Sequence, residues 1–261
     1  MLRCPICHSE LNKLDNTYKC LKGHSFDIAK SGYTNLLVNK KHTGDNKEMS
    51  KARNDFFKND YYHVLKIRLY EIIKELNINT LVDAGCGEGY YTNYLSDNLD
   101  LDIYAFDMSK YSLNYGAKAN KKVNYLASSI FDLPLIDNSI DLILSIFAPV
   151  AYEEFYRVLK DEGYFIKVSP LERHLWELKE AIYDKPYEND NKYVAYEGFN
   201  MIKEYHIKDR IIIDNLNDIK ALFMMTPYYF HTSKADVTKL DKLNKLEVTL
   251  EFKIELYQKK K

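Results

Sequence analysis

The chain has 261 residues, 46% of them hydrophobic and 14% aromatic, and its 37 Lys and Arg almost balance its 38 Asp and Glu. The apolar content excludes a disordered chain, and nine glycines and four cysteines are too few for collagen-like or disulfide-rich scaffolds. A net charge of −1 argues against a nucleic-acid partner, but residues 1–60 contain 11 basic and 7 acidic residues, so the whole basic excess lies at the front.

The sequence gives no indication of a membrane partner. No apolar run approaches the roughly 18 to 20 residues needed to cross a bilayer, and residues 1–10 lack the apolar core of a signal peptide. We therefore expect a cytoplasmic protein, in which cysteines are more often free or bound to a metal than joined in disulfides.

The first twenty residues contain three of the four cysteines, in a C-x2-C-x12-C-x3-H pattern that ends at a histidine. Zinc prefers four soft or borderline ligands in a tetrahedron, and the C-x2-C pair brings two thiolates onto one ion. His8 is a competing histidine, but it follows the first cysteine pair too closely to be as well placed. The spacing therefore predicts a zinc site formed by Cys4, Cys7, Cys20 and His24, which is structural because all four ligands come from the protein.

The surface of this front module is expected to be basic, as an RNA partner requires. Tyr18, Phe26 and Tyr33 are interleaved with the charges, where they either stack on bases or form a small core around the metal; both interpretations stay open. We assign residues 1–37 to a zinc-binding RNA-recognition module. The basic residues of this surface are Arg3, Lys13, Lys19, Lys22 and Lys30, together with Lys40 and Lys41, which follow the module directly.

The chain then becomes helical, and after residue 79 it alternates between strand and helix. Apolar residues recur at helical spacing at 49–57 and 65–76, which makes residues 38–78 a helical linker region. The later alternation predicts a parallel sheet with helices on both faces. We expect strands at 81–84, 103–106, 123–127, 140–147 and 164–168, and helices at 90–99, 113–119 and 151–159.

After Pro170 the alternation loosens, although the same domain continues over residues 79–261. The final strand, at 247–257, alternates apolar and charged residues, so we expect it to be an antiparallel edge strand with one covered face. The other elements expected here are helices at 171–183 and 217–225 and a strand at 201–214.

A glycine-rich turn follows the first strand of this domain. Gly85, Gly87 and Gly89 form G-x-G-x-G, whereas a dinucleotide fingerprint has its third glycine one residue later, where this chain has Tyr90. Glycines at such a turn let the backbone approach a ligand closely. Asp107 ends the second strand, where a carboxylate can accept both ribose hydroxyls of an adenosine.

This combination is typical of class I methyltransferases that use S-adenosyl-L-methionine. It predicts an α/β, Rossmann-like fold with a mostly parallel seven-stranded sheet, preceded by the zinc-binding module. We expect cofactor contacts at Asp83, Gly85, Gly87, Glu88, Gly89 and Asp107.

The segment after the fourth strand limits which kinds of methyl acceptor are possible. Ser145 to Pro149 stands where enzymes that act on exocyclic amines have D/N-P-P-Y/F, and here the Asp or Asn and the first Pro are missing. No cysteine in this region is available to attack a pyrimidine ring. A ring nitrogen or a small-molecule acceptor remains.

The zinc pattern and the glycine turn together resemble the RlmA family of 23S rRNA guanine-N1 methyltransferases, over essentially the whole chain. The resemblance implies methylation of a guanine in the loop of hairpin 35, in domain II of 23S rRNA, and, from the family alone, a homodimer. It is carried by residues 4–7 (CPIC), 23–37 (GHSFDIAKSGYTNLL), 84–92 (AGCGEGYYT), 147–149 (FAP), 173–179 (RHLWELK) and 225–227 (MTP).

The resemblance also implies functional residues. The zinc ligands are the four already named, and the cofactor contacts fall on Tyr62, Gly87, Glu88 and His174. One departure from the family is at residues 60–64, which read D-Y-Y-H-V where the family resembles G-H-Y-x-P.

The catalytic residues are not assigned by the sequence. N1 of guanine carries a proton, so methylation needs a base, stabilisation of the charge that develops on O6, or release of the proton to water. Glu88, Tyr196, Glu197 and His206 are all candidates for the base. Two other functions stay open: a small-molecule methyltransferase with a structural zinc lid, and a non-catalytic RNA-binding protein.

Overall fold

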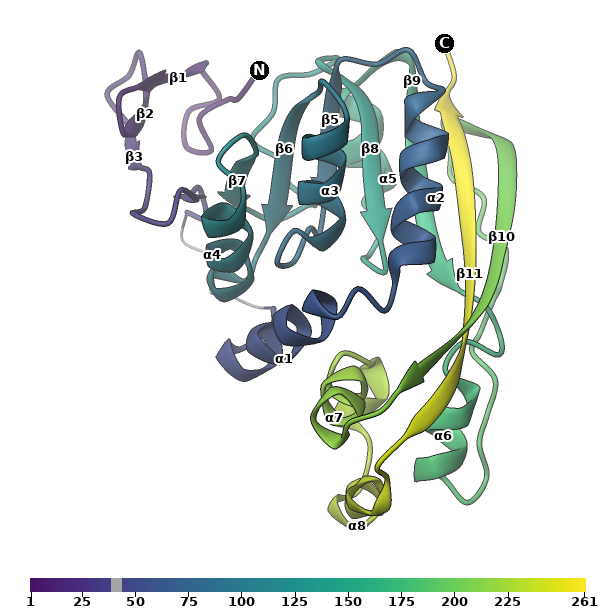
Figure 1. Cartoon of the computed structure of the whole chain (residues 1–261). Coiled ribbons are helices and arrows are strands. Elements are labelled where there is room, and N and C mark those ends of the chain that lie inside the picture. Colours follow the sequence, from purple (N-terminus) through teal and green to yellow (C-terminus); the bar gives the residue numbers. More distant parts are fainter. Residues whose placement is uncertain (39–43) are drawn as a thin grey trace.

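The computed structural model describes residues 1–38 and 44–261, and Figure 1 shows how its elements are arranged. Lys40 and Lys41, which we assigned to the basic surface, lie outside the described residues. In the part of the chain that is described, no helix combines the length and the apolar character needed to cross a membrane.

The front of the chain forms a small antiparallel sheet of three strands. These are β1 (Leu11–Leu14), β2 (Thr17–Cys20) and β3 (Ser25–Asp27). The next strand, β4 (Thr34–Asn35), pairs instead with the main sheet of the molecule. The front module is therefore joined to the rest of the fold by backbone hydrogen bonds as well as by the chain itself.

The two helices predicted between residues 38 and 78 are confirmed as α1 (Lys47–Lys58) and α2 (His63–Lys74). Asn46 caps α1, because its side-chain oxygen accepts the backbone N–H of Met49 at 2.9 Å. In Figure 1, α1 lies at the end of the sheet toward which β6 (Asp102–Asp107) and β8 (Ile140–Ile146) point. It packs there against α4 (Lys110–Ala119) and α7 (Leu216–Met224).

The main sheet has eight strands in the order β10-β11-β9-β8-β5-β6-β7-β4. Six strands, in the sheet order β4, β7, β6, β5, β8 and β9, run parallel to one another. Strand β11 is antiparallel to both β9 and β10. Seven of these strands were expected, and the class I methyltransferase fold is confirmed. The seven are β5 (Thr80–Ala84), β6 (Asp102–Asp107), β7 (Asn124–Ala127), β8 (Ile140–Ile146), β9 (Leu159–Pro170), β10 (Phe199–Ile213) and β11 (Leu246–Lys259).

Each face of the main sheet carries its own core. On one face, α2, α3 (Tyr90–Asn98) and α4 (Lys110–Ala119) bury apolar residues against the strands, and Leu69 of α2 and Leu142 of β8 belong to this core. On the other face, α5 (Tyr152–Val158) and the front module share a second core. The zinc-binding module thus supplies part of the hydrophobic packing of the methyltransferase sheet.

The helices that follow β9 lie beyond the carboxyl ends of the parallel strands (Figure 1). The predicted helix at 171–183 is shorter than expected, because Leu175 adopts a left-handed conformation (φ 56°) and α6 begins only after it. The elements here are α6 (Trp176–Ile182), α7 (Leu216–Met224), η1 (Pro227–Phe230), α8 (Lys234–Val237) and η2 (Thr238–Lys242).

The prediction that the last strand is an edge with one covered face is wrong. β11 lies between β9 and β10, and β10 is the edge. The charged face of β11 is buried as well as its apolar face, because residues of α6 and the turn before it bond to that side. Thr249, Glu251, Lys253 and Glu255 are each at most 8% exposed.

Candidate functional site

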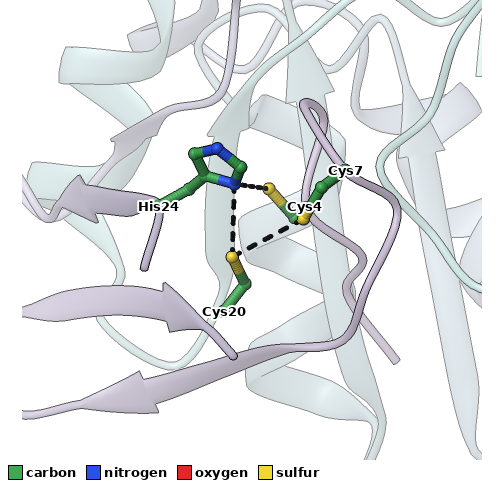
Figure 2. A group of neighbouring side chains, drawn as sticks. All are labelled: Cys4, Cys7, Cys20 and His24. Atoms are coloured by element: carbon green, nitrogen blue, oxygen red, sulfur yellow. Dashed lines mark hydrogen bonds between the residues drawn. The ribbon is translucent and has the colours of Figure 1, made fainter. Parts of the chain in front are cut away.

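The four predicted zinc ligands lie close together in the front module (Figure 2). One ligand atom from each of Cys4, Cys7, Cys20 and His24 lies within 4.8 Å of the other three. His8, the competing histidine, is exposed and is not part of the cluster.

The spacing of these atoms fits a tetrahedral zinc ion. Nδ1 of His24 is 3.5 Å from Sγ of Cys4 and 3.4 Å from Sγ of Cys20, and Sγ of Cys7 is 3.7 Å from Sγ of Cys20. Ligands bound tetrahedrally at about 2.0 to 2.3 Å are separated by roughly 3.3 to 3.8 Å. Because the protein supplies all four ligands, the zinc is structural.

Short turns place these ligands. His8 donates its backbone N–H to the carbonyl of Cys4 at 2.9 Å, which closes the first turn. Cys20 ends β2, and Gly23 with φ 87° turns the chain back so that His24 faces it. A positive φ of this kind suits glycine.

The aromatic residues of the front module are used for packing. Tyr18 is 7% exposed, and its hydroxyl donates to Oδ1 of Asn124 in β7 at 3.4 Å. Phe26 and Tyr33 are partly buried against the two cores. Of the two interpretations left open, the structure supports the core role for Tyr18. The exposed cations of the module are Lys13, Lys19, Lys22 and Lys30.

The glycine turn connects β5 to α3. Gly85, Gly87 and Gly89 all have positive φ, at 94°, 55° and 80°. A Cβ on Gly85 would lie 2.7 Å from Cβ of Ala148, so the missing side chain lets the turn approach the segment that follows β8. The turn therefore forms an open backbone cradle beside the segment predicted to face the acceptor.

Asp107 holds the same turn in place. One of its carboxylate oxygens accepts the N–H of Gly87 at 2.9 Å, and the other accepts the N–H of Ser109 at 2.7 Å. Burial raises the pKa of Asp107, although these two hydrogen bonds oppose the rise. Each oxygen keeps acceptor capacity that ribose hydroxyls can use.

Glu88 offers a buried polar atom with no internal partner. Its Oε2 makes no hydrogen bond to any described residue, and Nη1 of Arg53 lies 4.0 Å away. Burial raises the pKa of Glu88 to about 7. An orphaned buried carboxylate oxygen beside a glycine cradle and a strand-end Asp fits a bound nucleoside with hydroxyl or amino donors.

Sequence reasoning missed Arg53. Its guanidinium lies 2.5 Å from the Asp45 carboxylate as well as near Glu88, so α1 contributes directly to this site. A signal was present, because Arg53 falls at helical spacing between the buried residues Ser50 and Phe56. A cation on the buried face of a helix indicates a buried anionic partner.

Asp83 lies at the base of the turn. It is 2% exposed and accepts a hydrogen bond from the Thr92 hydroxyl in α3. Burial raises its pKa to about 7, and the charge of Asp107 adds to the rise. The structure thus brings together Asp83 and the turn residues on the strand ends, as the sequence predicted.

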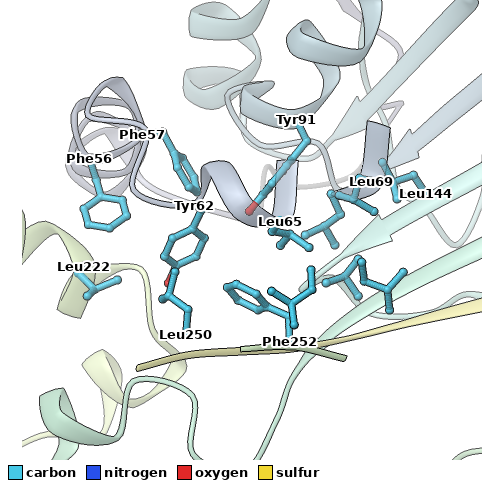
Figure 3. Close-up of a cluster of buried hydrophobic side chains, with 14 of the residues drawn as sticks. Phe56, Phe57, Tyr62, Leu65, Leu69, Tyr91, Leu144, Leu222, Leu250 and Phe252 are labelled. Carbon is cyan, nitrogen blue, oxygen red and sulfur yellow. The ribbon is translucent and has the colours of Figure 1, made fainter. Parts of the chain in front are cut away.

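Tyr62 and His174 form a second group, which Figure 3 shows in part. The Tyr62 hydroxyl is 3.5 Å from Nε2 of His174, and Nδ1 of His174 accepts the N–H of Glu251 at 3.3 Å. Burial lowers the pKa of His174 to about 3, so the ring is neutral. Phe57 stacks on Tyr90 at 4.3 Å and contacts Tyr62 edge-on, which links this group to the glycine turn.

The candidate bases are scattered. Glu88 lies in the cofactor turn, and Tyr196 is 9% exposed on the other face of the sheet, next to Tyr257. Glu197 is exposed, and His206 lies on the edge strand β10, where its Nε2 is 2.7 Å from Glu204. The structure does not bring these candidates together.

Comparisons with known proteins match both parts of the chain. Residues 2–44 match a family model described as RlmA, N-terminal, and residues 82–167 match a methyltransferase domain model. The solved structure of YcgJ from Bacillus subtilis has a TM-score of 0.52 and 17% identity, and covers 76% of this chain and 99% of that one. This likeness supports the fold alone.

Curated relatives extend over most of the chain. The 23S rRNA (guanine(748)-N(1))-methyltransferase of Streptomyces fradiae is 32% identical over 69% of this chain and 67% of its own length. YxjB of Bacillus subtilis, whose name places it among 23S rRNA (guanine-N(1)-)-methyltransferases, is 29% identical over 97% of this chain and 95% of its own. The chain therefore belongs to the RlmA family of 23S rRNA (guanine-N1)-methyltransferases, S-adenosyl-L-methionine-dependent enzymes that also carry a structural zinc site.

Proposed function

We propose that this protein transfers the methyl group of S-adenosyl-L-methionine to N1 of a guanine in the loop of hairpin 35 of 23S rRNA. The observation that carries the proposal is the pairing of β4 with β7, where Thr34 and Asn35 lie opposite Leu126 and Ala127. This pairing fixes the zinc-binding module at the edge of the methyltransferase sheet. A relative named for guanine 748 supports a single loop guanine as the target.

The front module is proposed to hold the RNA. Lys13, Lys19, Lys22 and Lys30 are exposed, so their charges are available to phosphates. The proposed division of labour follows the expected domains: residues 1–37 bind RNA, residues 38–78 link the parts, and residues 79–261 carry out the transfer. A cytoplasmic location and a homodimer, both expected above, belong to the proposal.

The cofactor is proposed to bind across the two groups of site residues. The positive φ angles of Gly85, Gly87 and Gly89 shape the turn that faces it, Asp107 accepts the ribose hydroxyls, and Glu88 receives a donor at its unpartnered oxygen. Tyr62, His174 and Asp83 are the further proposed contacts of the cofactor. When bound, the cofactor supplies an electrophilic methyl group on a sulfonium.

Guanine N1 is unreactive until its proton leaves, and in a duplex it is occupied by base pairing. A guanine in a loop, or one flipped out of a duplex, has an N1 that is free of base pairing. The loss of the N1 proton is assisted by holding the base in line with the methyl group, with water taking the proton.

The test uses the metal-loaded protein with a synthetic hairpin 35 RNA and S-adenosyl-L-methionine. An N1-methyl group blocks Watson–Crick pairing, so we expect a primer-extension stop at one loop guanine. A hairpin with adenine at that position is the control. Methylation of small molecules without any stop on the RNA would instead favour the small-molecule enzyme, and no cofactor binding in calorimetry would favour the non-catalytic RNA-binding protein.

The role of the front module has its own matched pair of variants. Lys22→Gln should weaken hairpin binding and reduce its salt dependence, because each phosphate contact releases counterions. Lys203→Gln changes an exposed lysine on β10, at the opposite edge of the sheet, and should leave binding unchanged. Equal effects of the two variants would contradict a specific role for the module. Light scattering of the same samples checks the expected homodimer.

A further inference from the structure

The polar face of β11 contains a buried ion cluster that the proposed function does not yet use. Nζ of Lys167 in β9 is 2.9 Å from Oε2 of Glu255, and Nζ of Lys253 is 3.6 Å from Oε1 of the same carboxylate. The Glu255 side chain is fully buried and that of Lys253 is 7% exposed. One carboxylate is therefore shared by two ammonium groups.

The cluster has an excess of positive charge at Lys253. The Tyr257 hydroxyl also donates to Oε1 of Glu255 at 3.0 Å, which is the same oxygen that Lys253 approaches. Among residues 1–38 and 44–261, Glu255 is the only salt-bridge partner of Lys253 within 4.0 Å. Taking a cation out of water is costly unless it is closely paired. The incomplete pairing of Lys253 points to a further anionic or acceptor group supplied by a ligand.

Other charged groups face Lys253 from the neighbouring elements. Glu172, after β9, has its pKa lowered by a hydrogen bond from Asn191 and also by the charges of Lys253 and His206. His206 lies opposite Lys253 in β10 and is bound to Glu204. The remaining acid nearby on β11, Glu251, is taken by Lys208 at 2.5 Å.

The strand registers place this cluster next to the acceptor segment. Lys167 pairs with Ser145 of β8 on one side and with Glu255 on the other, and Lys253 pairs with Ser169 near the end of β9. The Ser145 hydroxyl donates to the carbonyl of Ala148 at 3.4 Å, within the loop that the Gly85 turn approaches. Adjacent strands are about 4.8 Å apart, so Lys253 lies roughly 10 Å from that loop, within the reach of a long side chain and a base.

A second unpartnered polar atom lies at the same place. Oγ of Ser169 is buried and makes no hydrogen bond to any described residue. Ser169 is the direct register partner of Lys253, so the hydroxyl and the ammonium are on the same face of the sheet. The Ser169 hydroxyl thus lacks a hydrogen-bond partner among the described residues and lies beside an ammonium whose nearest carboxylate oxygen is 3.6 Å away.

We propose that the Lys253 ammonium is a catalytic residue that binds O6 of the target guanine, and that Glu255 and Lys167 are positioning residues that hold it there. This inference rests on the proposed function. As the N1 proton leaves to a water molecule, negative charge moves onto O6, where the ammonium stabilises it. The N1 lone pair then forms the bond to the methyl carbon, and the carbon–sulfur bond breaks with its electron pair on sulfur.

Lys167 is less suited to this role. Its ammonium is held at 2.9 Å by Glu255, and it lies two residues further from the carboxyl end of β9 than Ser169, the register partner of Lys253. The carboxyl ends of parallel strands are where α/β enzymes bind their ligands. Lys253 is therefore the cation nearer to the site.

The first experiment compares Lys253→Met with Lys253→Arg and the wild-type enzyme across pH 6.5 to 9.5. Removing one donor to a developing oxyanion typically slows turnover by about 100- to 1,000-fold. We expect Lys253→Met to lose activity on this scale at pH 7 and to recover it as pH rises, because hydroxide then removes the N1 proton. Lys253→Arg should keep most of the activity. A Lys253→Met profile parallel to that of the wild type would overturn the proposal.

A second readout does not depend on activity. Hairpin RNA with 2-aminopurine at the target position lacks O6, so the wild-type protein should bind it about tenfold more weakly than the guanine RNA, as for one lost charged hydrogen bond. Lys253→Met should bind both RNAs equally, while its cofactor affinity and thermal unfolding temperature stay near those of the wild type. Equal binding of the two RNAs by the wild type refutes the inference even if Lys253→Met does not fold. Absence of any guanine methylation by the wild type would instead refute the proposed function.

Discussion

Asp83 gives a prediction that can be worked out in magnitude. The carboxyl group is fully buried under the glycine turn, and its pKa is raised from 3.8 to about 7. In the unfolded chain it ionises near its ordinary value, so the unfolded state loses its proton first as pH rises. The folded state consequently loses stability between about pH 4 and pH 7, and the change is complete above pH 7.

The isosteric change Asp83→Asn removes this titration and keeps an oxygen to accept the Thr92 hydroxyl. A pKa difference of about three corresponds to about 4 kcal/mol at pH 8, whereas less than half of it is expressed at pH 5. The variant should therefore be more stable than the wild type at both pH values. Its advantage should grow by roughly 2 to 3 kcal/mol from pH 5 to pH 8.

Urea unfolding of the zinc-loaded, cofactor-free protein at pH 5, 6, 7 and 8 measures this difference. Asp100→Asn, which alters an exposed carboxylate between α3 and β6, is the matched control and should show no trend. An advantage of Asp83→Asn that is the same at pH 5 and pH 8, or a variant less stable than the wild type at pH 8, would refute the reasoning.

Three further predictions concern the same structure. Gly89→Ala places a methyl group 1.9 Å from the Tyr125 hydroxyl oxygen at a residue with φ 80°, so the unfolding temperature should fall by roughly 4 to 10 °C; Tyr125→Phe in the same chain should restore part of the loss. Cys7→Ser should release the zinc and abolish RNA methylation with cofactor affinity nearly unchanged in calorimetry, and an equal loss of both would show that the metal supports the whole fold. His174→Asn should weaken cofactor binding about tenfold without loss of zinc, and unchanged binding would remove His174 from the site.

Local patterns were sufficient to predict much of this protein. The zinc ligands follow from cysteine and histidine spacing, and the strand, glycine turn and Asp107 follow from periodicity and turn chemistry. Tyr62 and His174 are different, because they are 112 residues apart and no spacing rule joins them. Only the family resemblance indicated that they act together.

The errors come from pairings between distant segments. β11 has the alternating pattern of an edge strand, but β10 pairs with it and Glu177 of α6 bonds to Thr249 on its polar side. Glu255 and Glu251 on that side pair with Lys167 of β9 and Lys208 of β10, and a sequence pattern records polarity without recording partners. Arg53 was overlooked for the same reason, since Asp45 and Glu88 lie on other segments.

The two-residue strand β4 also determines whether the methyltransferase domain can be produced without the front module. A fragment that begins after residue 38 would lack β4 and leave the outer edge of β7 with unpaired backbone groups, including the Ala127 carbonyl that accepts the N–H of Leu36 at 2.9 Å. It would also uncover apolar side chains of the second core that the front module now shields. Open strand edges beside apolar surface are templates for aggregation. The zinc-binding module is thus a cap on the catalytic sheet, and a shortened catalytic fragment needs a redesigned edge at β7 to remain monodisperse.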